Sequence, residues 1–215
     1  MKIILREIIE WLICIILAVV LLLFIRYYIG TSTIVKQNSM STTLLPDERL
    51  WLNRLSRTMK KMPERGDIVT FEAPSVIRVN KEEYKNPVAT YNNEPQGLLE
   101  KFSHYVLEDG KISYIKRVIA LPGEYIEIKN GNVYIDGKRL EEDYLQEGIV
   151  TEMVQGNTEN TFFTDFTVPE NCVFVMGDNR TGSIDSRSFG CIPLEKMEGI
   201  VVFRFWPFLK FGIVK

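Results

Sequence analysis

The sequence predicts a mainly β protein, in which an N-terminal transmembrane helix precedes an antiparallel β-sheet domain with an inserted irregular subdomain. Three observations favour this fold class. The first 30 residues are dominated by an apolar run, later segments are short and rich in Val, Ile, Phe and Tyr, and Gly, Pro, Asn and Asp separate them. Such spacing is typical of antiparallel sheets rather than α/β folds. We therefore divide the 215 residues into an anchor, 1–30, and a β-rich domain, 31–215.

The first element is a membrane-spanning helix. Trp11–Ile25 is an unbroken apolar run, and its extension to Ile8–Ile29 is interrupted only by Glu10 and Arg26. As a helix the extended segment is about 33 Å long, which is enough to cross a hydrocarbon core of about 30 Å. We expect a single-pass protein in contact with a lipid bilayer.

The basic residues near the N-terminus predict its orientation. Lys2 and Arg6 favour a cytoplasmic N-terminus, which places the β domain on the extracytoplasmic side of the cell membrane. The alternative is a cleavable signal peptide. We favour the retained anchor because Arg26–Gly30 lacks the small-x-small pattern that a cleavage site needs.

The β domain is predicted from short strands and tight turns. The expected strands are Asp67–Phe71, Ile112–Leu121, Tyr125–Ile128, Val133–Ile135, Cys172–Met176 and Ile200–Phe205. Asn130-Gly131 and Asp136-Gly137 predict tight turns, because these residues tolerate positive φ angles.

Three segments fit this pattern less well. Pro74–Gly110 is polar and reads as an insertion with a short helix near Leu98–Tyr105, whereas residues 140–168 form a second loop-rich region with a strand or hairpin. Leu50–Met62 alternates and then becomes basic. We interpret it as a half-buried strand, although Trp51 could instead contact lipid.

Composition excludes several classes of function. A net charge of −2 gives no reason to expect nucleic-acid binding. We also expect the protein to be a monomer. Three cysteines without a CxxC pair, and one histidine, argue against a metal or other cofactor. Cys172 and Cys191 could form a disulfide, but two buried thiols are the preferred interpretation.

Ser39 and Lys116 are the candidate catalytic pair. His104, the chain's one histidine, lies in a polar stretch without a recognisable catalytic setting, so a serine hydrolase would need another base. On a strand, Lys116 shares its face with Tyr114 and Val118, while Arg117 points the opposite way. Burial among apolar neighbours would lower the pKa of Lys116 and allow its neutral amine to accept a proton.

Four segments in order resemble the bacterial type I signal peptidase family, peptidase family S26, which are membrane-bound serine proteases. They are Val35–Leu44 around Ser39, Arg65–Val69, Tyr114–Gly123 around Lys116, and Gly177–Arg187 followed by Phe189-Gly190. The resemblance spans the anchor through to the C-terminus. It implies an endopeptidase that removes signal peptides from exported preproteins, which bind as extended chains with small residues at the first and third positions before the cut.

The same resemblance implies roles for individual residues. Ser39 would be the nucleophile, Lys116 the general base, and Ser183 a hydroxyl that orients the lysine. Asp185 and Arg187 would form a structural ion pair.

We also interpret Asp178 and Arg180 as scaffold, since each acid in this segment has an arginine two residues away. The nucleophile segment departs from the family at Thr42, where proline is usual, and at Gln37, where glycine or serine is common. Gln37 could help the Ser39 backbone N–H to hold the oxyanion, or it could point away and leave that amide to act alone.

The sequence leaves two alternative functions to consider. A related Ser-Lys protease could cleave itself, as repressor proteases do, but those are soluble DNA-binding proteins and this chain has an N-terminal span. An inactive membrane β protein that serves in assembly is disfavoured by the presence of both Ser39 and Lys116.

Overall fold

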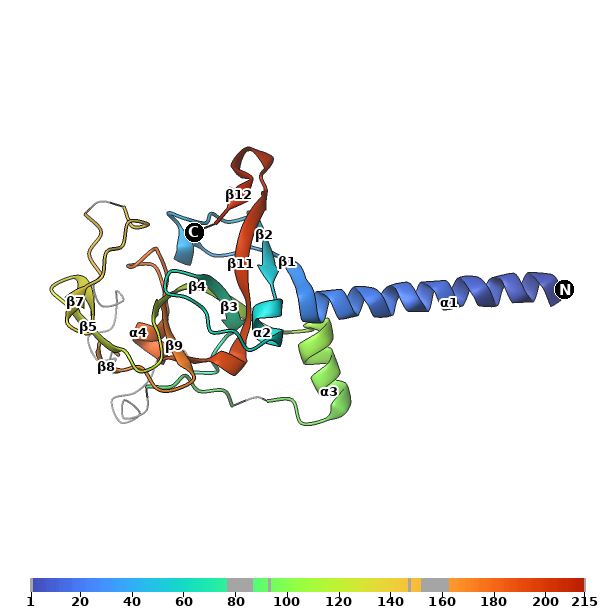
Figure 1. Ribbon diagram of the computed structural model, residues 1–215, viewed down its shortest axis with the longest axis horizontal. Helices are drawn as coiled ribbons and strands as arrows, with labels where there is room; N and C mark the ends of the chain where they lie inside the picture. The colour runs from blue at the N-terminus through green and yellow to red at the C-terminus, as the bar shows by residue number, and fades with distance from the viewer. Residues whose placement is uncertain (1, 77–86, 93, 147, 152–162, 215) are drawn as a thin grey trace.

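A computed structural model describes residues 2–76, 87–92, 94–146, 148–151 and 163–214. Helix α1 (Lys2–Phe24) continues into a π-helical segment, η1 (Ile25–Ile29), and projects away from the β domain (Figure 1). Ile4–Ile29 is the one helix of the described residues that is long and apolar enough to cross a membrane, and its most apolar stretch buries no residue against the protein. The predicted N-terminal helix is confirmed.

The larger sheet has eight strands, all paired antiparallel, in the order β1-β2-β11-β3-β4-β9-β10, and β12 pairs with β11. Its strands are β1 (Gly30–Ile34), β2 (Arg49–Asn53), β3 (Ile68–Glu72), β4 (Ser113–Ala120), β9 (Cys172–Met176), β10 (Ile192–Pro193), β11 (Met197–Trp206) and β12 (Gly212–Ile213). β1 follows η1 without a linker, so the sheet starts where the anchor ends.

The smaller sheet has four strands in the order β7-β6-β5-β8: β5 (Tyr125–Lys129), β6 (Asn132–Ile135), β7 (Lys138–Arg139) and β8 (Asp165–Thr167). Both predicted turns are present, with positive φ at Asn130 and Gly131 and at Asp136 and Gly137. The antiparallel β fold that the spacing predicts is therefore confirmed.

Three apolar clusters form the core. One fills the space between the two sheets, and a second packs on β3, β4 and β9. A third lies under the segment that carries Ser39, and contains Val35, Met40, Leu44, Leu50, Leu52, Ile68 and Val201. The nucleophile segment is thus held by its own buried neighbours.

Short helices connect the strands. They are α2 (Leu55–Thr58), α3 (Leu98–Phe102), the π-helical η4 (Ser103–Leu107), α4 (Ser186–Phe189), and the 3₁₀ turns η2 (Asn38–Met40), η5 (Leu194–Lys196) and η6 (Phe208–Lys210). The helix predicted near Leu98–Tyr105 is confirmed by α3 and η4.

One strand prediction is corrected. Leu50–Met62 begins as the expected half-buried strand, but β2 ends at Asn53 and α2 follows. The Asn53 side chain accepts a hydrogen bond from the Leu55 N–H at 3.0 Å, which satisfies a free donor of the helix start.

The two irregular regions are only partly described. Residues 77–86 and 93 of the predicted insertion, and 147 and 152–162 of the second loop region, lie outside the described residues. The second region contains β8 as its predicted strand. Cys172 and Cys191 are buried free thiols, which confirms the preferred interpretation over a disulfide.

Candidate active site

Ser39 lies in the middle of η2, between β1 and β2. The turn is closed by backbone hydrogen bonds from Ser41 N to Asn38 O and from Leu44 N to Met40 O, at 3.0 and 2.8 Å. Met40 is fully buried in the third apolar cluster, which anchors the turn. Ser39 itself is only 6% exposed.

Lys116 reaches Ser39 from β4. Its Nζ lies 2.7 Å from Ser39 Oγ and also donates to the Ile115 carbonyl at 3.0 Å. The residue is 2% exposed, and the Tyr114 ring lies 5.3 Å from Nζ. The structure thus brings the two residues together across 77 positions of sequence.

Burial dominates the electrostatics of this amine. Desolvation lowers the pKa of Lys116 from 10.5 to about 8. The carboxylates of Asp185 and Asp178 oppose this shift, and the Arg187 guanidinium adds to it. A substantial fraction of the amine is therefore neutral near physiological pH.

Arg117 and Asp178 form a buried ion pair on the opposite face of β4. The guanidinium donates to both carboxylate oxygens, from Nε at 2.9 Å and from Nη2 at 2.7 Å. Asp178 also accepts from Thr43 Oγ1 at 2.5 Å, which connects the pair to the segment after Ser39. Sequence reasoning missed Arg117, although its place beside Lys116 on an apolar strand was a usable signal.

Asp178 and Arg180 do not form the ion pair that their closeness in sequence suggested. Arg180 binds Glu142 through Nη1 at 3.1 Å and the Gly177 carbonyl through Nε at 3.2 Å. Asp178 is occupied by Arg117 because that side chain reaches it from β4. Both residues are nevertheless buried parts of the scaffold.

Asp185 and Arg187 form a second buried ion pair. The guanidinium donates to the two carboxylate oxygens at 2.8 Å each, and Asp185 also accepts from the Gly177 N–H at 3.0 Å. Although burial opposes it, this set of donors holds the pKa of Asp185 below its usual range.

Ser183 lies beside the nucleophile segment. A Cβ on Gly177 would be 2.3 Å from Ser183 Oγ and 2.4 Å from the Ser39 carbonyl, so only glycine fits between them. Ser183 Oγ is buried and makes no hydrogen bond within the described residues, although it is close enough to Asp185 to help lower the pKa of that carboxyl. Its hydrogen bond to Lys116 is not formed here, so the orienting role stays a prediction.

A groove of about 290 Å³ opens beside Ser39. The chain from Thr33 to Gln37 lines one side and Lys111–Ile115 lines the other. Gln37 is exposed and is one of the residues that line the groove. Thr70 also lines it, and its buried hydroxyl has no hydrogen-bond partner among the described residues.

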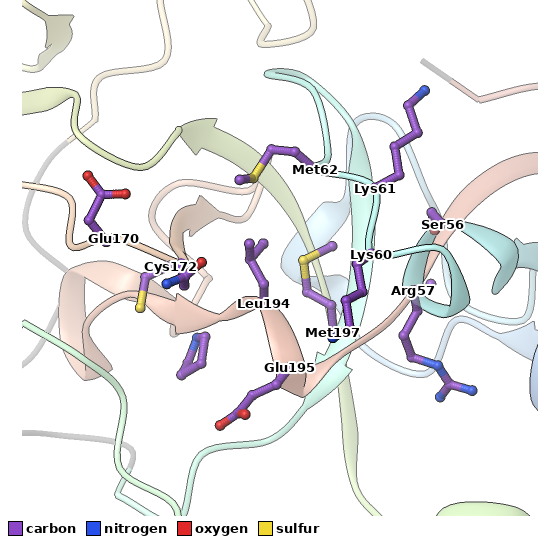
Figure 2. A pocket seen from close by; sticks show the side chains of 13 residues that line it. Ser56, Arg57, Lys60, Lys61, Met62, Glu170, Cys172, Leu194, Glu195 and Met197 are labelled. Atoms are coloured by element: carbon purple, nitrogen blue, oxygen red, sulfur yellow. The ribbon is translucent and has the colours of Figure 1, made fainter.

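A larger cavity, of about 640 Å³, is separate from this site (Figure 2). Met62, Leu194 and Met197 gather at its centre, whereas Lys61 extends away from it. Neither Ser39 nor Lys116 lines it, so size does not identify the reactive site.

Other chemistries find little support in the described part of the chain. No group of three His, Cys, Asp or Glu side chains there lies close enough together to hold a metal ion. His104 Nε2 lies 3.3 Å from Glu72 Oε1, and His104 is not among the groove residues. Ser39 and Lys116 form a buried hydroxyl–amine pair at hydrogen-bond distance.

Comparisons with known proteins identify a family. A family model described as signal peptidase, peptidase S26, matches residues 8–206. A probable signal peptidase I-1 of Synechocystis is 33% identical over 195 residues, which cover 91% of this chain and 81% of that protein. Signal peptidase IB of Staphylococcus aureus is 30% identical over 219 residues, covering 96% and 93%.

Among solved structures, a signal peptidase I from Enterococcus faecalis is 29% identical. The match covers 65% of this chain and 97% of that one, with a TM-score of 0.38.

Proposed function

The chain belongs to the signal peptidase family, peptidase S26, and on that premise we propose that it removes N-terminal signal peptides from exported preproteins, with Ser39 as nucleophile and neutral Lys116 as general base. The observation that carries this proposal is the 2.7 Å contact between Lys116 Nζ and Ser39 Oγ in a buried site. We assign residues 1–30 to the membrane anchor and 31–215 to the peptidase domain, which acts as a monomer.

The proposed reaction follows from this contact. The neutral amine accepts the Ser39 hydroxyl proton while Oγ attacks the scissile carbonyl. The resulting ammonium returns the proton to the leaving amine, which releases the mature protein and leaves the signal peptide as an acyl-enzyme. Water then attacks the ester with Lys116 again as base. Burial favours each proton acceptance because it raises the neutral fraction of the amine.

The oxyanion is assigned to two donors. The Ser39 backbone N–H is one, and the Gln37 side-chain amide is the other, since Gln37 is exposed and lines the groove beside Ser39. A side-chain amide in such a position contributes about 10²–10³ in rate. If Gln37→Gly keeps the turnover rate of the parent within about twofold, the Ser39 backbone amide is the sole donor.

Substrate binds as an extended chain in the groove between residues 33–37 and 111–115. Both walls continue strands, so their backbone groups are placed for β-pairing with a peptide of any sequence. The groove has a volume of only about 290 Å³, which supports the expectation of small side chains near the cut.

The anchor explains the location of the activity. An N-terminus in the cytoplasm places the peptidase domain at the outer face of the cytoplasmic membrane. Because β1 follows η1 directly, the nucleophile segment stays near the lipid surface, where signal cleavage sites emerge.

The test is cleavage of a signal-bearing precursor by the full chain in vesicles. Ser39→Ala and Lys116→Ala should each abolish cleavage, whereas Lys138→Ala, an exposed change on β7, should not. Cleavage that persists in either of the first two variants contradicts the mechanism. Self-cleavage without precursor cleavage would favour the repressor-like alternative, and no cleavage by the parent would favour the assembly factor.

The role of Ser183 needs a kinetic separation. Ser183→Ala should lower kcat more than it raises KM, because it acts on the base rather than on the substrate. A rise in KM as large as the fall in kcat would contradict that role.

A further inference from the structure

The helix within the insertion exposes an apolar face. Leu98, Leu99 and Phe102 are 88%, 85% and 47% exposed, and their spacing places them on one side of α3. The helix start is capped, since the Glu100 carboxylate accepts from the N–H of Gly97, the N-cap residue, at 3.3 Å and from that of Gln96 at 3.1 Å. A capped, well-formed helix therefore presents two adjacent leucines that no described part of the chain covers.

This helix is fixed to the outer end of the anchor. Glu108, directly after η4, accepts hydrogen bonds from Arg26, at 2.8 Å, and from the buried Arg54. Arg26 lies in η1, and Arg54 Nη1 also donates to its carbonyl at 3.1 Å. In Figure 1, the helix labelled α3 runs across the direction of α1, close to the end of α1 that meets the β domain.

The neighbouring helix α2 is attached to the same end. Arg57 donates to the Tyr27 carbonyl and Thr58 Oγ1 donates to the Tyr28 carbonyl, the latter at 2.9 Å. Leu55 on α2 and Met59, directly after α2, are both exposed apolar side chains. Apolar groups thus project on both helices that pack around the base of the anchor.

We propose that α3 and η4 form an interfacial helix, in which Leu98, Leu99 and Phe102 insert into the bilayer surface as a second membrane contact. The proposal rests on the membrane anchor proposed above. The bilayer is the occupant because ion pairs hold the helix at the level where the anchor leaves the lipid. A helix lying in that plane with one apolar face gains free energy by burying it, and Lys101 on its flank can reach lipid phosphates.

The contact also bears on the substrate groove. The chain leaves η4 at Leu107 and enters the groove wall at Lys111, whose ammonium is paired with the buried Glu198 at 2.7 Å. Only three residues separate the helix from that wall. A helix fixed in the lipid surface therefore holds one side of the groove at a defined height above the bilayer.

The proposal is tested by the depth of a fluorescent probe on the full chain in phosphatidylcholine–phosphatidylglycerol vesicles. An environment-sensitive nitrobenzoxadiazole label is placed on Leu99→Cys in a Cys14→Ala background and quenched with lipids carrying a nitroxide near the headgroup. The same label on Cys14, the one exposed native cysteine of the described residues, reports the anchor. A label on Lys138→Cys in β7 reports a site in water.

We expect blue-shifted emission from the label at position 99, with quenching roughly threefold or more above that at position 138. Adding Leu98→Asp should reduce the quenching at position 99 by about half or more, whereas adding Lys138→Asp should leave it unchanged. If the emission and quenching at position 99 equal those at position 138 while the label on Cys14 remains in lipid, the interfacial helix is refuted. The membrane anchor is not affected by that result. Insensitivity to Leu98→Asp also refutes the interfacial helix, and a water-exposed Cys14 overturns the anchor itself.

Discussion

Replacing the proposed base should make the protein more stable while it abolishes activity. Lys116 is buried, and its pKa falls from 10.5 to about 8. Below pH 8 the folded protein must therefore hold an ammonium without the solvation that the unfolded chain provides. A pKa unit corresponds to about 1.4 kcal/mol, so this penalty is about 3 kcal/mol at pH 7.

Lys116→Met removes that charge and keeps an unbranched side chain of similar length. It also removes the hydrogen bonds to Ser39 Oγ and to the Ile115 carbonyl, which together cost about 2 kcal/mol. The net expectation at pH 7 is a gain of about 1 kcal/mol in the free energy of unfolding.

The sign of the pH dependence follows from proton binding. Between pH 8 and 10.5 the unfolded state binds the Lys116 proton and the folded state does not, so the stability of the parent rises with pH over this window. The difference in stability between Lys116→Met and the parent should therefore move by about 2 kcal/mol in favour of the parent between pH 7 and pH 9.5.

Urea unfolding of the full chain in detergent, followed by tryptophan fluorescence, measures both values. Lys138→Met, an exposed change on β7, is the matched control and should leave stability unchanged at either pH. Two results would refute the idea that the folded protein holds an unsolvated ammonium at this site. One is a Lys116→Met variant that is less stable than the parent at pH 7, and the other is a stability difference that does not change with pH.

Three further predictions follow from groups near the site. Precursor cleavage should rise with pH through about 8, where Lys116 loses its proton, and full activity at pH 5 would contradict a lysine base. Asp178→Asn should destabilise the fold by about 3 kcal/mol because it leaves the buried Arg117 guanidinium without its carboxylate, and a urea midpoint equal to the parent's would show that the pair is dispensable. Thr70→Val should raise the free energy of unfolding by about 1 kcal/mol by removing a buried hydroxyl without a partner, and an unchanged value would mean that the hydroxyl is hydrated in the groove.

Local patterns predicted the parts of this fold that depend on neighbours in sequence. The hairpin at Asn130-Gly131 and the strand around Lys116 were predictable, because turn preference and alternation are local properties. The strand predicted at Leu50–Met62 failed beyond Asn53, where one side-chain hydrogen bond starts a helix instead.

In the candidate site, too, some residues were indicated by the sequence and others are set only by tertiary contacts. Motif order indicated Ser39 and Lys116, and burial on an apolar strand indicated the direction of the lysine pKa. The partner of Asp178 was not predictable from spacing, because the nearby Arg180 and the distant Arg117 compete and only the folded sheet decides between them. The Glu108 link to the anchor is likewise a tertiary contact without a local signal.

β4 presents two consecutive cations to opposite faces of one sheet, Lys116 toward the hydroxyl and Arg117 toward a carboxylate. A slip of a single position along β3 would exchange them. A guanidinium that never loses its charge would then face the serine, while the titratable amine would be held by Asp178. The same residues would be present, but the proposed proton acceptor would no longer face Ser39. In the proposed mechanism, catalysis therefore depends on the register of β4 as much as on the identity of its residues.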